Sequence, residues 1–323
     1  GPDSPTNNQS ATFQFNSNEE DSTFECRMDS GSWSSCSSPK SYSSLSEGSH
    51  SFAVKATDDA ENTGATDYHN WTIDLTDPVA TISSGPDNPT NSQSATFQFA
   101  SNEDDSTFEC KMDSGSWSSC SSPKSYSSLS EGTRSFQVKA TDEAGNTGSP
   151  DYHNWTIDLS GPAASISSGP RNPSHNQTAS FSFSSEEDNS TFQCKLDSGS
   201  WSSCSSPKSY NSLTEGNHVF KVKATDESDN VGSPATYSWT IDFSIVVDKN
   251  GNGDYTSISS ALANSTSVNT IKVWEGIYYE NLIVNKTISL LGNGTNTIIN
   301  GSYSNYTVWV SADGVVIDGF TIE

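Results

Sequence analysis

Cysteine is the residue type whose spacing promises the most chemistry in this chain. The six cysteines fall into three pairs with nine residues between partners: Cys26 with Cys36, Cys110 with Cys120, and Cys194 with Cys204. A zinc site would need further cysteine or histidine ligands at short spacing, and the sequence offers none around the pairs. The regular pairing therefore predicts disulfide bonds, formed in an oxidising compartment outside the cytoplasm.

Acidic residues in one recurrent turn are the candidate metal ligands. Asp58, Asp142 and Asp226 stand at equivalent positions, each followed four residues later by an asparagine. Carboxylate and amide oxygens are ligands that Ca²⁺ prefers. The same side chains also cap the backbone N–H groups of a turn without any ion. Both interpretations stay open, and no other cofactor is predicted.

No catalytic constellation emerges from the remaining residues. Catalysis would require paired carboxylates, a Ser/His/Asp set or a metal cluster. The five histidines are scattered and share no motif. His69 and His153 correspond to Tyr237 in the next repeat, which predicts a packed aromatic position rather than a ligand or a general base. We therefore expect that this chain is not an enzyme.

Tryptophans and sequons are the remaining candidate sites. Trp33, Trp117 and Trp201 fall in the predicted hairpins beside the cysteines. An exposed indole there could stack on a sugar, but we favour packing against the disulfide or a sheet edge. Among the many Asn-x-Ser/Thr sequons we select the following glycosylation candidates: Asn70, Asn154, Asn189, Asn285 and Asn305. Asn70 and Asn154 neighbour tryptophans that are predicted to point inward, so both should face solvent.

Charge and composition limit the class of partner. The net charge is −25, which argues against nucleic acid and anionic membranes as partners. Hydrophobic residues make up 31% of the chain and aromatic residues 10%, a balance that fits thin β-sandwiches with small cores rather than disorder. No run of 18 apolar residues occurs, so we expect no membrane insertion by this segment.

Internal repetition defines the domains. The chain matches itself at an offset of 84 residues, which aligns Gly1 with Gly85 and Gly169. Periods above about 50 residues indicate whole domains in tandem. Alternating apolar residues separated by turn residues predict seven strands per repeat, the signature of a sandwich. We predict repeats at 1–76, 77–160 and 161–243, a different domain at 244–323, and a first repeat that lacks the strand supplied to the second by residues 79–83.

The repeats resemble a known family. The string STFECKMDSGSWSSCSSPKSYSSLSEGTRSFQVKATDEAGNTG is similar to bacterial and archaeal immunoglobulin-like domains that carry a cysteine pair, an L-x-x-G-x-x-x-F-x-V-x-A-x-D stretch and an AGN turn. The resemblance covers residues 1 to about 243. It implies stalks, spacers or adhesive arms of secreted or surface proteins.

The last 80 residues resemble another family. Residues 245–302 are similar to the opening of pectin-methylesterase-like and NosD-like right-handed β-helices, with Gly251, Gly253, Asp254, Tyr255 and Ile258 on the G-x-G-D-[YF]-x-[TS]-I motif. The resemblance implies that the catalytic motifs of the esterases fall in later coils. Helical spacing of Ile258, Ala261 and Leu262 predicts a short capping helix. Residues predicted to point inward include Ile271, Val273, Ile283, Ile288, Leu290, Ile298, Val308, Val310, Val315, Ile317, Phe320 and Ile322.

These inferences combine into one prediction. The fold is all-β, with three tandem Ig-like β-sandwiches and the first coils of a right-handed parallel β-helix that has a short N-terminal capping helix. The function is that of a non-catalytic, acidic, glycosylated extracellular segment, a cell-surface stalk or filament subunit whose partners are copies of itself or other surface proteins. The alternative is the carbohydrate-binding portion of a larger secreted polysaccharide-active protein, with glycans as partners.

Overall fold

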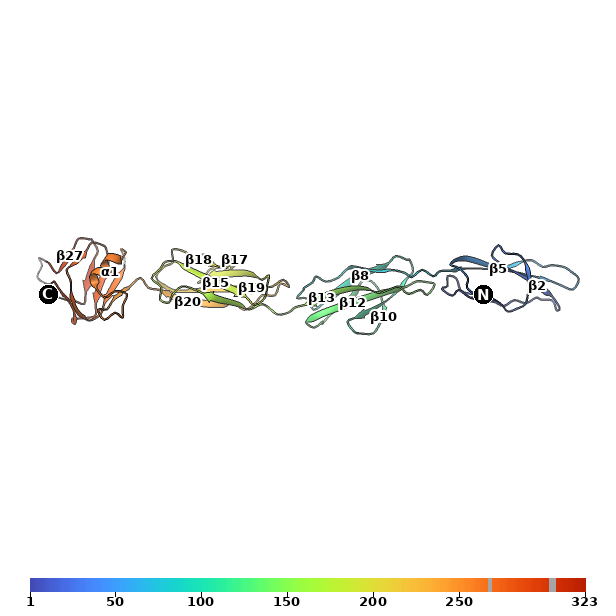
Figure 1. The fold of residues 1–323 in the computed structure, drawn as a ribbon, viewed down its shortest axis with the longest axis horizontal. Helices are drawn as coiled ribbons and strands as arrows, with labels where there is room; N and C mark the ends of the chain where they lie inside the picture. The colour runs from blue at the N-terminus through green and yellow to red at the C-terminus, as the bar shows by residue number, and fades with distance from the viewer. Residues whose placement is uncertain (267–268, 302–305) are drawn as a thin grey trace. The chain divides into compact units, whose positions relative to one another are not determined.

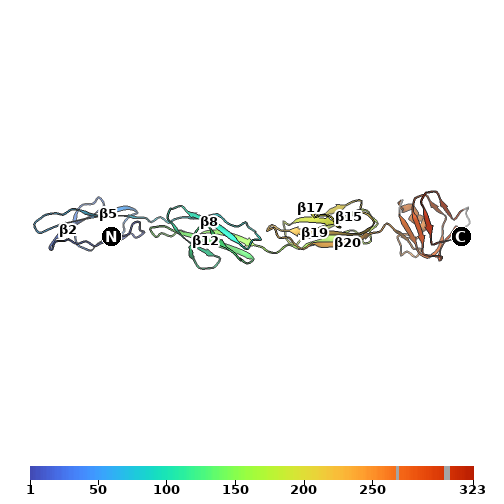
Figure 2. The same ribbon diagram turned by 180° about the vertical axis from the view of Figure 1, so that it is seen from behind.

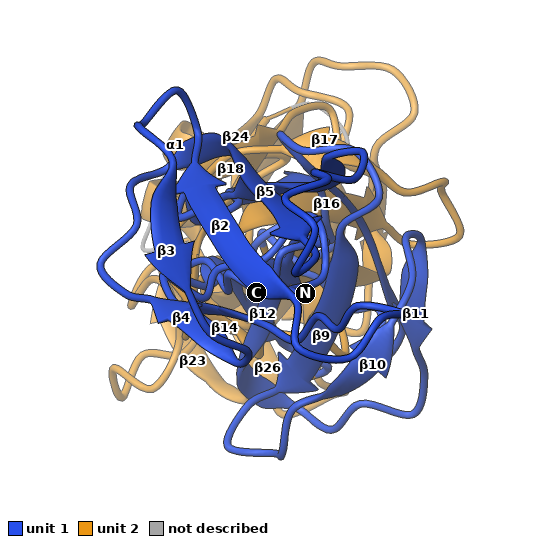
Figure 3. Cartoon of the chain, turned by 90° about the vertical axis from the view of Figure 1, so that its right-hand side faces the viewer, with its two compact units in different colours: residues 1–159, 227–230 blue, residues 160–226, 231–323 orange. Residues whose placement is uncertain are grey.

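The computed structural model describes residues 1–266, 269–301 and 306–323. These residues form β-strands and a single short helix, so the all-β prediction is confirmed (Figures 1 and 2). By its internal contacts the chain divides into two compact units, residues 1–159 with 227–230 and residues 160–226 with 231–323 (Figure 3). The three predicted boundaries between the four domains stay a prediction.

The second repeat is a two-sheet sandwich of seven antiparallel strands, as the sequence predicts. One sheet has the order β10-β9-β12-β13 and the other the order β11-β8-β7. The strands are β7 (Ala80–Ser84), β8 (Ala95–Ser101), β9 (Thr107–Met112), β10 (Ser118–Cys120), β11 (Lys124–Tyr126), β12 (Gly132–Thr141) and β13 (Asp151–Ile157).

The third repeat has the same design, and the first differs at one edge. In the third repeat the sheets are β17-β16-β19-β20 and β14-β15-β18, whereas the first has β3-β2-β5-β6 but only β1-β4. Within the described residues no strand pairs with the outer edge of β1, in agreement with the prediction of a missing strand. The strands are β1 (Ala11–Phe13), β2 (Thr23–Met28), β3 (Ser34–Cys36), β4 (Lys40–Tyr42), β5 (Gly48–Thr57), β6 (Asp67–Ile73), β14 (Ala164–Ser168), β15 (Ala179–Ser185), β16 (Thr191–Leu196), β17 (Ser202–Cys204), β18 (Lys208–Tyr210), β19 (Gly216–Thr225) and β20 (Ala235–Ile241).

Aromatic side chains form the core of each sandwich. Successive side chains of a strand point to opposite faces, so one face of each strand supplies the core. Phe97 of β8 stacks on Phe136 of β12 with 4.0 Å between ring centroids, and both rings are fully buried. Trp155 of β13 lies 5.3 Å from Phe97. Strands from both sheets thus meet at one aromatic cluster, which recurs as Phe13, Phe52 and Trp71 and as Phe181, Phe220 and Trp239.

Each cysteine pair forms a disulfide bond inside its own repeat. The bonds join Cys26 to Cys36, Cys110 to Cys120, and Cys194 to Cys204. In the second repeat the bond links β9 to the three-residue edge strand β10, and Cys110 is 1% exposed. The bridge therefore fixes a short edge strand, which has only three backbone pairs of its own, to the centre of its sheet.

The position occupied by His69, His153 and Tyr237 is a packed aromatic position, as predicted. The His153 ring meets Phe97 edge-on at 5.6 Å, and its Nε2 lies 3.0 Å from the carbonyl oxygen of Pro86. Tyr237 donates its hydroxyl to the carbonyl of Pro170 at 2.7 Å. A Cβ on Gly85 would lie 2.8 Å from the His153 ring, so glycine is required where the chain passes over it.

The C-terminal region is a parallel β-solenoid of about three coils. Its three sheets have the orders β21-β22-β25-β28, β23-β26-β29 and β24-β27, and every pairing is parallel. The strands are β21 (Ile245–Val247), β22 (Thr270–Val273), β23 (Gly276–Tyr279), β24 (Leu282–Val284), β25 (Ser289–Gly292), β26 (Thr297–Asn300), β27 (Val308–Val310), β28 (Val316–Asp318) and β29 (Thr321–Ile322).

Helix α1 (Ile258–Asn264) packs on the first coil and buries the three predicted residues Ile258, Ala261 and Leu262. Both of its ends are held by charged side chains of the solenoid. The carboxylate of Glu280 accepts hydrogen bonds from the backbone N–H groups of residues 258 and 259 at 2.8 and 2.7 Å, and Lys286 donates to the carbonyl of Ser265 at 2.7 Å. These charges satisfy the unpaired backbone groups of the helix ends and complement its dipole.

The prediction of which solenoid residues point inward is wrong for several positions, and at two of them the buried residues are the immediate neighbours. Ile283 is 53% exposed, whereas its neighbours Leu282 and Val284 are fully buried. Ile299 is fully buried, whereas the predicted Ile298 lies on the opposite face. A shift of one residue moves a strand's whole apolar set to the other face. The predicted residues Val310 and Ile322 are also exposed, at 46% and 51%.

Phe136→Ala tests the aromatic core. The truncation removes a fully buried ring and should cost the second repeat about 3–5 kcal/mol of unfolding free energy, the usual range for Phe→Ala in a core. Urea unfolding followed by hydrogen exchange of peptides from this repeat measures the change. Tyr152→Ala, at a side chain 55% exposed on the same sheet, is the control and should change stability by less than about 0.5 kcal/mol. Equal effects of the two variants would contradict this account of the core.

Candidate functional site

Three carboxylates gather where the end of the first repeat meets the second. Asp74 follows β6, Glu103 follows β8 and Asp142 follows β12, and one oxygen of each lies within 4.8 Å of the others. Oxygens at such distances form the ligand set that a hard cation such as Ca²⁺ prefers. The sequence pointed to Asp142, placed Glu103 in a separate acidic patch that was interpreted as a solvated hairpin tip, and missed Asp74. The missed signal is that an acid stands at both positions in the next repeat, as Asp158 and Glu187.

Like charge dominates the electrostatics of this carboxylate group. Burial raises the pKa of Glu103, and the nearby charges of Asp142 and Asp74 raise it further. The turn after β12 is tied to the first repeat, because Asn146 donates its amide to the carbonyl of Asp74 at 2.9 Å and to the Asp142 carboxylate at 2.8 Å. The Asn146 side chain thus links the segment that carries Asp74 to the turn that carries Asp142, despite the like charge of the two acids.

Two of the three calcium candidates predicted from the sequence accept hydrogen bonds from backbone N–H groups of the turns that they begin. Asp58 accepts hydrogen bonds from the backbone N–H of Ala60 at 2.9 Å and of Asn62 at 2.8 Å, and hydrogen bonds from Asn62 and Ala60 lower its pKa. Asp142 accepts from the N–H groups of residues 145 and 146, both at 2.7 Å. Asp226, 8% exposed, precedes the equivalent turn. The structure shows capping, and calcium binding stays a prediction.

A buried cation site recurs beside the core tryptophan. In the first repeat His50 is 8% exposed, with Nδ1 3.0 Å from a carboxylate oxygen of Asp29 and Nε2 2.7 Å from the carbonyl oxygen of Ser46. Both oxygens only accept hydrogen bonds, so the ring satisfies both only when both nitrogens carry protons. His218 repeats this arrangement with Asp197 and Thr214 at 2.9 and 2.8 Å.

The second repeat places a permanent cation in the same position. Arg134 donates to the carboxylate of Asp113 at 2.8 Å and to the carbonyl of Ser130 at 3.1 Å. The hydrogen bond to Ser46, helped by Asp29 and opposed by burial, raises the pKa of His50. For His218 burial acts to lower the pKa, but the hydrogen bonds and the Asp197 charge outweigh it, so the pKa is raised. The fold therefore favours a positive charge at this position in all three repeats.

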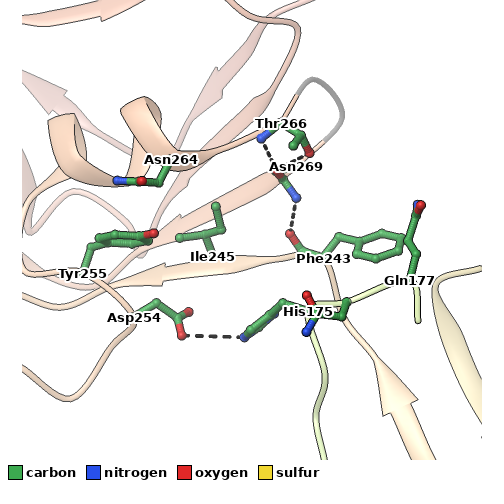
Figure 4. A pocket seen from close by; sticks show the side chains of 10 residues that line it. His175, Gln177, Phe243, Ile245, Asp254, Tyr255, Asn264, Thr266 and Asn269 are labelled. Atoms are coloured by element: carbon green, nitrogen blue, oxygen red, sulfur yellow. Dashed lines mark hydrogen bonds and ion pairs between the residues drawn. The ribbon is translucent and has the colours of Figure 1, made fainter. Parts of the chain in front are cut away.

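A cleft of about 750 Å³ lies in unit 2 between the third repeat and the first solenoid coil (Figure 4). Asp254 and His175 face each other across it at 3.6 Å, and Asn269 donates to the carbonyl of Phe243 at 2.8 Å. The ring of Tyr255 forms part of one wall. His175 and Asp254 are 44% and 36% exposed, so solvent screens their interaction. The described residues that line the cleft provide polar contacts but no nucleophile aligned with a base.

The hairpin tryptophans lie on the sheet, but their partners are cations. Trp117 is half-buried, with the ammonium groups of Lys111 and Lys139 each 4.9 Å from its ring centroid. Trp33 has Arg27 and Lys55 at 4.9 and 4.8 Å. The rings therefore cover the lysine and arginine side chains of the outer sheet face, a contact that the sequence did not predict.

Four of the five glycosylation candidates are exposed: Asn70, Asn154, Asn189 and Asn285. Asn305 lies outside the described residues. Trp71 and Trp155 are 2% and 1% exposed, so the neighbouring asparagines face solvent as predicted. Glycosylation itself stays a prediction. In the described part of the chain, no helix has the length and apolar character needed to span a membrane.

Comparison with known proteins finds similarity to one domain family and to several solved structures. The family model of the bacterial Ig-like domain (group 3) matches residues 40–111. Among solved structures, the fibronectin(III)-like modules of Clostridium thermocellum CbhA are 16% identical with a TM-score of 0.32, covering 50% of this chain and 94% of that chain. The FN1-FN3 domains of chicken CNTN1 are 12% identical with a TM-score of 0.30, covering 74% and 99%. No curated protein matches.

The His50 site predicts a specific pH dependence. Because its folded pKa is raised, its contribution to stability is complete below the ordinary histidine pKa of about 6.5 and is lost as the pH rises through the folded pKa. The first repeat should therefore lose resistance to urea as the pH rises above the ordinary histidine pKa and through the raised pKa of His50. His50→Arg should abolish this loss, and Arg134→His should create it in the second repeat. Urea unfolding of each repeat at a series of pH values measures both, and an unchanged pH profile in either variant would contradict a cationic site.

The carboxylate group predicts a gain from removing one charge. Above the ordinary carboxyl pKa, ionised Glu103 is repelled by Asp74 and Asp142, so Glu103→Gln should raise the urea midpoint of the second repeat at neutral pH in metal-free buffer. The gain should vanish at acid pH, where the native side chain is already protonated. Glu143→Gln, an exposed acid in the same turn, is the control and should give no comparable gain. A loss of stability in Glu103→Gln would show that the carboxylate is not repelled.

Proposed function

We propose that this chain is a non-catalytic structural segment of a secreted or cell-surface protein, a stalk or filament subunit that acts mechanically. The observation that carries the proposal is that three near-identical sandwiches each close their own aromatic core and their own disulfide. Tandem copies of a non-catalytic domain lengthen a protein without adding an enzymatic activity. Ig-like domains of this kind serve as structural or adhesive modules.

The strand pairing suits a load-bearing role. In the second repeat, β12 pairs with β13 over seven residues and with β9 over six. The loop between Cys110 and Cys120 cannot be stretched while the disulfide persists, and such bonds persist in oxidising surroundings. The excess of 40 acidic over 15 basic residues favours solubility, which suits a protein exposed to bulk water.

Neighbouring copies or other surface proteins are the proposed partners. A strand edge with unpaired backbone groups accepts an additional strand. The outer edge of β1 is such an edge among the described residues, and in the second repeat β7 occupies the equivalent place. The solenoid is proposed to be related to the pectin-methylesterase-like and NosD-like β-helices.

Single-molecule stretching of the full chain tests the mechanical role. We expect the repeats to unfold as separate events in oxidising buffer. With reductant, each event should lengthen by about 30 Å, because ten residue steps of about 3.5 Å are released from a span of 5.8 Å. In oxidising buffer, the double variant Cys110→Ser with Cys120→Ser should show the same added length in one unfolding event only, that of the second repeat.

The stretching experiment has two clear failures. Unfolding of all repeats in one event would show that they are not separate mechanical units. Unfolding at forces no greater than those of an unstructured chain would show that the segment bears no load. Protease treatment of intact cells that make the protein, which should remove it from the surface, tests the location separately.

A further inference from the structure

The outer face of the four-stranded sheet in the third repeat is unusually basic. Cys194 of β16 and Val222 of β19 point into the core, at 1% and 0% exposure. Their neighbours therefore point outward, because side chains alternate along a strand. The outward residues form what we call the basic face: Gln193, Lys195, Lys221 and Lys223, with Trp201 lying over it.

The other two repeats carry an acid on the same face. In the first, Glu25 stands opposite Lys55 and forms an ion pair at 2.9 Å. In the second, Glu109 stands opposite Lys139 at 2.8 Å. The third repeat has Gln193 opposite Lys223, so the neutralising acid is gone.

An additional lysine makes the face of the third repeat more basic still. Arg27 stands opposite Ala53 in the first repeat, and Lys111 opposite Gln137 in the second. In the third repeat Lys195 stands directly opposite Lys221. Two cations and one acid give these positions a charge of +1 in each of the first two repeats, whereas three cations and no acid give +3 in the third.

The basic face is destabilising without a partner. Like charges directly opposite each other on neighbouring strands oppose folding. None of the ion pairs among the described residues involves Lys195, Lys221 or Lys223. Trp201 offsets part of this cost, with Lys195 and Lys223 at 5.2 and 5.0 Å from its centroid. No cation–π contact of Lys221 occurs among the residues that the structure describes. In a chain of net charge −25, three clustered cations without acids indicate an anionic ligand.

The chemistry around the lysines favours a sugar polymer. Trp201 is half-buried, so part of its ring remains accessible for stacking. Gln193 and the hydroxyl-bearing Thr236 and Ser238 are exposed on the same sheet and offer hydrogen bonds to sugar hydroxyls. Nucleic acid presents one charge per about 1.7 Å of duplex and needs a larger basic surface than three lysines in an acidic chain.

We propose that the basic face of the third repeat binds an acidic polysaccharide, with carboxylate or sulfate groups paired to Lys195, Lys221 and Lys223 and a sugar ring stacked on Trp201. This binding activity goes beyond the mechanical role and does not depend on it. A chain that fails to bear load would still bind the glycan, and a chain that fails to bind would still unfold repeat by repeat.

Affinity electrophoresis of the full chain tests the proposal. The probes are polygalacturonate, which carries carboxylates, dextran sulfate, which carries sulfates, and neutral dextran. We expect at least one acidic glycan to retard the chain and dextran to have no effect. Whichever of polygalacturonate and dextran sulfate retards the chain more identifies the preferred anionic group. Lys195→Gln with Lys221→Gln should weaken binding on the order of tenfold, equivalent to about 1.4 kcal/mol. Trp201→Ala should weaken binding as well.

Matched variants separate this site from general charge attraction. Lys111→Gln with Lys139→Gln removes the same number of cations from the second repeat and should leave binding within about twofold, a difference well below 1 kcal/mol. The Lys195/Lys221 double variant should also resist urea better than the native chain without glycan, because the opposed charges are gone, which shows that its sheet is intact.

Three outcomes would overturn the proposal. The first is that neither acidic glycan retards the chain. The second is that the control variant in the second repeat loses as much binding as the double variant in the third. The third is that polyglutamate or single-stranded DNA binds as tightly as the glycans and Trp201→Ala has no effect, which would show a general polyanion site.

Discussion

The stacked pair of phenylalanines at the centre of each sandwich is the interaction on which the rest of the structure depends. Only 31% of the residues are hydrophobic, so a module of about 80 residues has few side chains with which to form a core. Phe97, Phe136 and Trp155 concentrate buried area in three rings, and aromatic residues bury more surface than any others. The disulfide then adds stability that so small a core cannot supply alone, because it restricts the conformations of the unfolded chain near one edge of the sheet.

Charge is placed around this core in a pattern that differs among otherwise similar repeats. Beside the core tryptophan the fold keeps a cation whose identity changes from His50 to Arg134 to His218, so the charge matters more than the residue type. On the outer sheet face the third repeat loses its acid and gains a lysine. At the carboxylate group the backbone brings acids together despite their repulsion. The repeats thus share a core and differ in surface electrostatics.

The sequence predicted whatever depends on local pattern. Alternation located the seven strands, the cysteine spacing gave the three bridges, and the spacing of Ile258, Ala261 and Leu262 gave the helix. It did not predict what depends on segments distant in the sequence. Asp74 meets Glu103 and Asp142 only through folding, and the register of β24 in the solenoid, where neighbouring residues 282–284 are all apolar, has no alternation to fix it. The basic face needed the strand register, because only pairing shows that Lys195 opposes Lys221.

The account as a whole requires that each sandwich close on itself. Peptide mapping of the native protein by mass spectrometry without reduction measures this directly, since each bridge yields one linked pair of peptides. We expect three linked pairs, each within a single repeat, and no free thiol. A free thiol at any of the six cysteines, or a linked pair that joins two repeats, would contradict it.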